Sequence, residues 1–241
     1  MKRVLNAALI AILVAPVAGL LARDLQAPRV GDAASRARGD AAWREGLHAQ
    51  AVAAGGHYFH VTSWESELQF DTVDTLFHRS DVVVLGDVLE GWSHLSKHGD
   101  YVTTDYRLHV QQVFKGNLNP NSVVVLQVMG GKYIFDDGTD VQIETRGFAR
   151  PIRGDRIVVF GGVVNGADWL SPGVINYAGG IPILSPTAGS RGVVTVPDND
   201  TDKVRVNDVA ARDPMSHTLR MTSVGVLIAD LQRLANSEKR Q

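Results

Sequence analysis

The stretch TTDYRLHVQQVFKG at residues 103–116 indicates the fold class, because it predicts one long strand whose alternation slips near its end. Every second residue up to Val110 belongs to one face, the period of a strand: Val102, Thr104, Tyr106, Leu108 and Val110. Val113 then lies at the wrong parity, and a β-bulge near Gln111 and Gln112 would return it to the core. A bulge inside a long strand lets a small sheet coil enough to close.

Further strands are predicted on both sides of this stretch. Residues 82–92 (VVVLGDVLEGW) are rich in β-branched side chains, and Gly86 within them indicates a bend or a close backbone contact. The polar residues 94–100 (HLSKHGD) predict a hairpin loop between these two strands. Three more strands are predicted at 122–129, 140–145 and 156–161, with shorter apolar pieces between residues 163 and 196.

Two helices are predicted to bracket the strands. Residues 71–79 (DTVDTLFHR) carry apolar side chains at helical spacing. A C-terminal helix is predicted at about residues 219–235, where apolar residues recur every three or four positions: Met221, Val224, Leu227, Ile228, Leu231 and Leu234. Such a stripe needs a surface to cover, so we expect this helix to dock on the strands.

These elements predict a mainly β protein. Strands do not alternate with long helices, which disfavours a parallel α/β sheet. The strand lengths, the bulge and the mid-strand glycine favour a small antiparallel Greek-key barrel of the OB type. We expect this barrel, with a short helix before it and the C-terminal helix packed on it, to occupy residues 57–241.

Three stretches carry a resemblance to known proteins: SDVVVLGDV at 80–88, TTDYRLHVQQVFKG at 103–116 and GFARPIRGDRIVVF at 147–160. Together they resemble a group of exported bacterial proteins of unassigned function. Their pattern is similar to the barrel of the tissue inhibitor of metalloproteinases and netrin modules. The resemblance covers roughly residues 70–165 and implies an OB-type barrel. The inhibitors reach the protease zinc through an N-terminal cysteine, and this chain has no cysteine, so that mechanism is not implied.

The first 22 residues have the pattern of an export signal. Lys2 and Arg3 precede an uncharged apolar stretch, Ala7–Ala22, which is short for a membrane-spanning helix. We expect a cleaved signal peptide or, if cleavage fails, an N-terminal membrane anchor, and therefore a periplasmic or extracellular protein. Residues 23–56, rich in Ala, Arg and Gly, are interpreted as a spacer or a loosely packed helix.

Composition excludes several function classes. The absence of cysteine rules out disulfides, cysteine nucleophiles and thiolate metal sites. The net charge is −2, and it becomes −4 if residues 1–22 are removed with their two cations. With aromatic residues at only 7%, this charge argues against nucleic acid as a partner. No cofactor is indicated.

The histidines give no metal motif. His94 and His98 have the spacing of two ligands one helical turn apart, but they fall in a predicted loop and no Glu lies between them. His57 and His60 are likewise too few. We interpret all of them as solvated loop histidines. No Gly-x-Ser-x-Gly elbow is present, so any Ser–His–Asp site would have to be assembled from distant loops.

Two predicted loops combine aromatic and charged residues, as recognition surfaces commonly do. The first, Gly91–Asp100, holds Trp92, Lys97 and Asp100, and the second, Tyr133–Asp140, holds Tyr133, Phe135, Asp136 and Asp137. The same aromatic rings could instead cover the ends of a barrel. Three functions stay open: a non-catalytic binding domain that recognises another envelope protein, a cysteine-independent inhibitor or partner of an envelope peptidase, and a hydrolase with a dispersed site.

Overall fold

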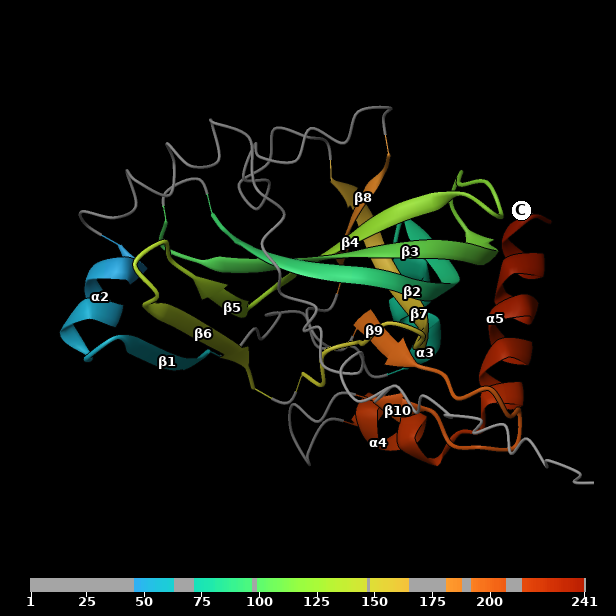
Figure 1. The fold of residues 1–241 in the computed structure, drawn as a ribbon. Helices are drawn as coiled ribbons and strands as arrows, with labels where there is room; N and C mark the ends of the chain where they lie inside the picture. The colour runs from blue at the N-terminus through green and yellow to red at the C-terminus, as the bar shows by residue number, and fades with distance from the viewer. Residues whose placement is uncertain are drawn as a thin grey trace, which may run out of the picture.

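A computed structural model describes residues 46–62, 72–96, 99–146, 148–164, 181–187, 192–206 and 214–240. The protein is mainly β, with two sheets and short helices at both ends of the described chain (Figure 1). The helices are α2 (Leu47–Ala53), α3 (Val73–Arg79), α4 (Pro214–Met221) and α5 (Val224–Glu238). The strands are β1 (His57–Thr62), β2 (Val82–Leu95), β3 (Val102–Lys115), β4 (Val123–Met129), β5 (Gly131–Ile134), β6 (Asp140–Thr145), β7 (Arg156–Val164), β8 (Ile183–Pro186), β9 (Val193–Thr195) and β10 (Arg205–Val206).

The larger sheet has the strand order β10-β9-β7-β2-β3-β4-β8. Strand β8 also pairs with β7, so the pairings run from β7 through β2, β3 and β4 to β8 and back to β7. All neighbours in this ring of five strands are antiparallel except β4 and β8, which are parallel. The expected all-antiparallel order is therefore wrong at that pair.

The predicted bulge in the long strand β3 is confirmed. Leu85 lies opposite Gln112 while Gly86 lies opposite Val110, which leaves Gln111 as the extra residue. Beyond it, Val113 packs against the same apolar cluster as Val110. The close contact expected at Gly86 is also present, because a Cβ there would lie 2.8 Å from the His109 carbonyl oxygen.

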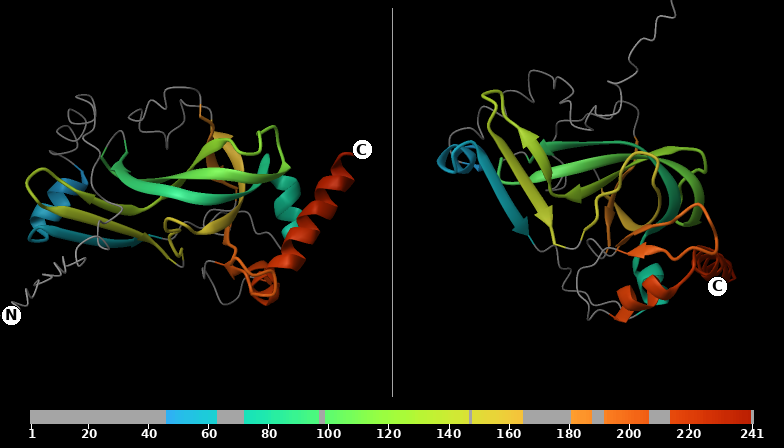
Figure 2. Two further views of the ribbon diagram at one scale, coloured as in Figure 1. Left: turned by 45° about the vertical axis from the view of Figure 1, so that its right-hand side comes forward. Right: turned by 60° about the horizontal axis from the view of Figure 1, so that its bottom comes forward.

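The smaller sheet has the order β1-β6-β5, with β1 parallel to β6. It lies with α2 at one end of the long β2–β3 hairpin, and α5 lies toward the other end (Figures 1 and 2). The predicted strand at 140–145 is thus present as β6, but it lies in the small sheet and outside the ring. In the ring, β8 occupies the place expected for β6. The reason is its alternation: Val141 and Ile143 give it one apolar face, whereas the ring strand β7 buries both faces.

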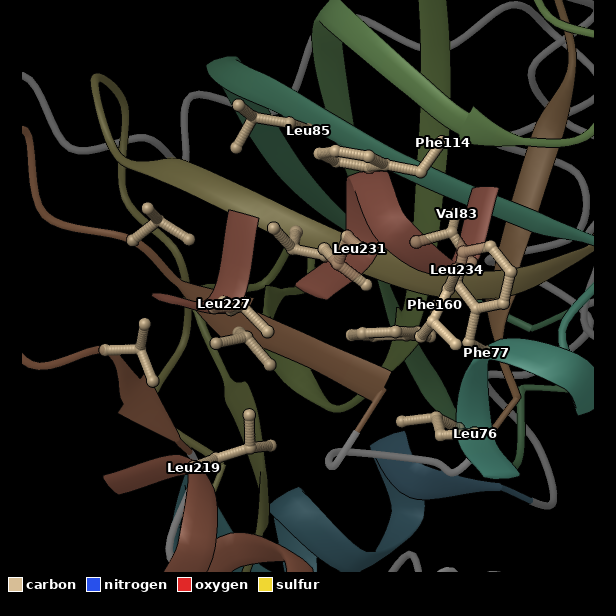
Figure 3. Packing of buried hydrophobic residues seen from close by; sticks show 14 of the residues in the cluster. Leu76, Phe77, Val83, Leu85, Phe114, Phe160, Leu219, Leu227, Leu231 and Leu234 are labelled. Carbon is tan, nitrogen blue, oxygen red and sulfur yellow. The ribbon is translucent and has the colours of Figure 1, made fainter. Parts of the chain in front are cut away.

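Two apolar clusters use opposite faces of the ring strands. One draws side chains from all five strands, which face one another within the ring; it includes Val84, Leu108, Leu126, Ile157 and Leu184. The other uses the alternate residues Val83, Leu85, Val158 and Phe160, which pack against α3, α4 and α5 (Figure 3). Because both faces are covered, β2 and β7 carry nearly continuous apolar runs instead of strict alternation.

The docking predicted for the C-terminal helix is confirmed. Val224, Leu227, Leu231 and Leu234 of α5 are buried, and Leu231 and Leu234 lie beside Phe114 and Phe160 in Figure 3. The single helix expected from residue 219 is wrong, since the chain breaks between α4 and α5, and the Met221 side chain is 63% exposed. The break follows from pairing: Val204 N–H donates to the Thr222 carbonyl, and Val224 N–H donates to that of Asp202.

Helix α2 closes the small sheet. Its buried residues Leu47 and Ala51 join a third apolar cluster with side chains from both sheets, so this part of the expected spacer packs against the strands. The predicted signal at residues 1–22 lies outside the described residues. No helix in the described ranges is long and apolar enough to cross a membrane.

Candidate functional site

The structure places the first candidate loop partly on a strand. Because β2 continues to Leu95, Trp92 and His94 are strand residues, and the turn is confined to residues 96–101, where Ser96 N–H donates to the Tyr101 carbonyl at 2.8 Å. Asp100 is exposed and accepts a hydrogen bond from Ser96 Oγ at 2.5 Å. Lys97 and His98 lie outside the described residues.

The second candidate loop is a tight turn between β5 and β6. Tyr133 lies on β5, and Phe135 N–H donates to the Thr139 carbonyl to close the turn at 2.8 Å. Asp136 and Asp137 lie at its exposed tip. Both loops therefore keep their acidic groups accessible.

The fold brings these two loops to the same end of the molecule. Leu95 and Val102 flank the first turn, and they share an apolar cluster with Phe135 of the second. Helix α2 joins both, because Leu47 belongs to this cluster and its N–H donates to the Gly99 carbonyl at 3.1 Å. The sequence did not predict that the two loops lie close together, because they are far apart in the chain. Their proximity depends on the small sheet folding back onto the β2–β3 hairpin.

The aromatic residues of the second loop pack inward. Phe135 is only 6% exposed, with its ring edge-on to His48 at 4.5 Å and to Tyr133 at 5.1 Å between centroids. Phe135 is therefore not the exposed anchor that the sequence suggested; it holds α2 against the small sheet. In the first turn, Tyr101, next to Asp100, is 45% exposed.

A hydrogen bond between His48 and Asp137 fixes the tip of the second loop. His48 Nε2 lies 2.9 Å from Asp137 Oδ2, and Asp137 also accepts hydrogen bonds from Thr139 N and Oγ1. The hydrogen bond from His48, followed by those from Thr139, lowers the pKa of Asp137 to about 2. Asp137 is therefore a carboxylate at any physiological pH, and its neighbour Asp136 adds a second exposed acidic side chain.

A buried polar cluster on β2, β3 and β4 was missed by sequence reasoning. His94 Nε2 lies 3.1 Å from Asp105 Oδ2, and Gln127 Nε2 donates to Asp105 Oδ1 at 2.9 Å. On the same face, Arg107 Nη1 donates to Glu90 Oε1 at 2.6 Å. The signal in the sequence is the run of polar residues at the alternate positions of the long strand β3: Thr103, Asp105, Arg107, His109 and Gln111.

The interpretation of His94 as a solvated loop residue is wrong. Its side chain is 10% exposed and its Nδ1 lies 3.3 Å from the Leu95 carbonyl oxygen. Burial disfavours the imidazolium, but the carboxylate of Asp105 beside it and the hydrogen bonds to Asp105 and Leu95 raise the pKa of His94 above its usual value. The His94 ring therefore stays protonated, and paired with Asp105, up to a higher pH than an ordinary histidine.

The described residues do not assemble a metal centre from these groups. No group of three or more His, Cys, Asp or Glu side chains that could hold an ion occurs in the described ranges. His57 instead pairs with Asp140 at 2.5 Å, and His60 stacks on Tyr58. Within the same part of the chain, His94 contacts the Asp105 carboxylate and the Leu95 carbonyl, and neither of these is a hydroxyl group.

An open cleft of about 480 Å³ lies farther along the ring, around the turn before β7. Its lining combines carboxylates, guanidinium groups and an amide: Asp87, Asp198, Arg153, Arg156 and Gln111. Gln111 Nε2 donates to Asp87, and Arg156 Nη2 donates to the Pro197 carbonyl. The cleft is a mixed-charge surface.

Neither a scan against protein-family models nor a search of curated proteins finds a match to this chain.

Proposed function

We propose that the five-stranded ring is a Greek-key barrel of the OB type, similar to the netrin-type barrel of the metalloproteinase inhibitors. Support comes from the closed circuit of pairings, the parallel β4–β8 pair within an otherwise antiparallel ring, and the bulged long strand β3. In such barrels the loop between the first two strands commonly contributes to binding, and here that loop is residues 96–101.

On this framework we propose a non-catalytic binding domain that is exported to the cell envelope and recognises another envelope protein. The observation that carries the proposal is the meeting of the two candidate loops at one end, held in place by α2. A rigid frame that presents loops with exposed acidic and aromatic groups is typical of recognition surfaces. Asp100, Tyr101 and Asp136 supply those groups here.

The experiment compares the full chain with the double variant Tyr101→Ser, Asp136→Asn as bait for envelope extract. We expect one envelope protein to be retained stoichiometrically by the unchanged chain and at least about tenfold less by the double variant, because truncating a central aromatic anchor typically costs 2 kcal/mol or more. Ile152→Ser is the matched control: Ile152 is exposed, in the turn whose Gly154 N–H donates to the Val88 carbonyl. Val88 lies seven residues before Leu95 on β2, about 23 Å along the strand.

Retention by neither chain, or equal loss in the control, would overturn the proposal. A retained protein with peptidase activity that the chain lowers would favour the second function, a cysteine-independent peptidase inhibitor that uses the same loops.

One observation favours the third function, a hydrolase with a dispersed site: His94 and Asp105 form a buried pair of the type that orients a general base. The test is turnover of esterase, glycosidase and peptidase substrates by the full chain. Turnover that His94→Ala abolishes, while Ile152→Ser leaves it unchanged, would replace the binding proposal by this one.

A further inference from the structure

Among the described strands, β1 is an outer strand of the small sheet. Because β1 is parallel to β6, alternate residues of β1 direct both backbone groups toward β6. The hydrogen bonds from Asp140 N–H to the Gly56 carbonyl and from Arg146 N–H to the Thr62 carbonyl fix which residues these are. The backbone groups of His57, Phe59 and Val61 therefore point away from β6, and they have no partner among the described residues.

The same residues carry exposed apolar side chains. Phe59 is 49% exposed and Val61 is 42% exposed, both on the face of the sheet turned away from the apolar cluster that Tyr58 joins. Strand β1 also contains none of the devices that usually protect an edge: it has no Lys, Pro or Gly, and the pairings with β6 continue without a bulge over all six residues. An accessible backbone edge and an apolar surface thus coincide.

We propose that β1 pairs antiparallel with β1 of a second copy of this chain, which joins the two small sheets into one six-stranded sheet of order β5-β6-β1-β1-β6-β5. A two-fold axis at Phe59 places Phe59 opposite Phe59 of the second copy and His57 opposite Val61 of the second copy. In this register the three outward-facing residues of each strand make about six backbone hydrogen bonds. The proposal is independent of the binding function proposed for the loops.

A second copy fits this edge because the strand is complementary to itself. The sequence HYFHVT has no formal charge at pH 7 when its histidines are neutral, so two copies meet without electrostatic repulsion. The two-fold axis also brings the two exposed Phe59 rings into direct cross-strand contact, a pairing that stabilises sheets. Neither the uncharged strand nor the Phe59 pair requires a charged residue on the partner.

The first test compares the association of the full chain with that of two charge variants, by analytical ultracentrifugation in a non-ionic detergent that keeps residues 1–22 from joining copies. Phe59→Lys places two ammonium groups directly opposite each other at the axis, and we expect at least a tenfold weaker dimer. Ile134→Lys is the matched control. Ile134 is 44% exposed on the same face of the same sheet, but it lies on β5, two strands away from β1, so we expect its dimer to be unchanged.

The second test uses the absence of cysteine, which makes a single introduced thiol unique. At the proposed axis the two Cα atoms of residue 59 lie about 5.5 Å apart, within the range that a disulfide spans. We expect Phe59→Cys to form a disulfide-linked dimer under mild oxidation. Ile134→Cys should not, because five strand spacings, about 24 Å, separate its two copies.

Several outcomes would overturn the proposal. A full chain that stays monomeric at about 100 μM, well above the Kd of an ordinary specific dimer, would do so. So would equal cross-linking at positions 59 and 134, which indicates non-specific association. A monomer whose backbone amides at 57, 59 and 61 resist hydrogen exchange would show that another part of the same chain occupies the edge. If the chain stays monomeric in both tests but binds a foreign extended peptide, the partner of the β1 edge is a different protein and not a second copy.

Discussion

His94 is a titratable ring that the fold holds almost fully buried against the carboxylate of Asp105, with Gln127 completing the set. A buried pair of this kind adds little to the free energy of unfolding when compared with apolar residues of similar size. Removing one partner, however, destabilises the protein, because the other partner is left buried and unpaired. The cluster therefore makes stability sensitive to single substitutions and to pH.

The stability of the protein should fall as the pH rises past the ordinary histidine range. Because the pKa of His94 is raised in the folded state, the folded chain binds a proton more tightly than the unfolded chain. The resulting stabilisation is complete below the unfolded pKa of about 6.5 and is lost as the pH rises through the higher folded value. Urea unfolding between pH 5.5 and 8.5 measures this fall.

Asp105→Asn isolates the origin of that pH dependence. The variant should lower the free energy of unfolding by about 3 kcal/mol near pH 5.5, where the charged pair is intact in the unchanged chain. The difference between the two chains should shrink as the pH rises. A constant difference across this range would show that the His94–Asp105 pair does not cause the pH dependence.

At the scale of a secondary-structure element, α5 is held by one apolar stripe. Leu227 is buried in the cluster that α5 shares with the ring, whereas its neighbour Val226 is exposed. Leu227→Asp should lower the free energy of unfolding by more than about 3 kcal/mol, because it removes a buried side chain and introduces a charge into an apolar contact. Val226→Asp changes the same helix by the same charge and should leave Tm nearly unchanged. Equal Tm values for both variants would mean that α5 does not stabilise the ring.

At the scale of the whole molecule, we predict that residues 1–22 direct export. The reason is the pair Lys2 and Arg3 followed by the uncharged stretch Ala7–Ala22. Fractionation of cells that express the full chain should place it in the envelope or outside the cell. Replacing Leu9 and Leu13 with Asp, which interrupts the apolar stretch, should retain the protein inside. Full-length chain with Met1 intact in the cytoplasm would contradict the prediction.

Much of the fold could be predicted because it depends on local patterns. The strands β2, β3, β4, β6 and β7, the bulge at Gln111 and the docked C-terminal helix all follow from the period of apolar residues. Turn residues mark where these strands end. The candidate site was predictable only in part: the sequence indicated two loops with acidic residues, while burial of Phe135 and the position of α2 depend on contacts between distant segments.

The mainly β class, the faces of the long strands and the absence of any cysteine chemistry follow from the sequence alone, since each depends on residue type and short-range spacing. The folded structure is needed to show that β8 closes the ring while β6 pairs with β1, and that His94 meets Asp105 beneath the surface. This is because strand pairing joins any two edges whose backbone groups and exposed faces match. The alternation within one strand specifies its faces, and the neighbours it acquires depend on how all the strands together bury them.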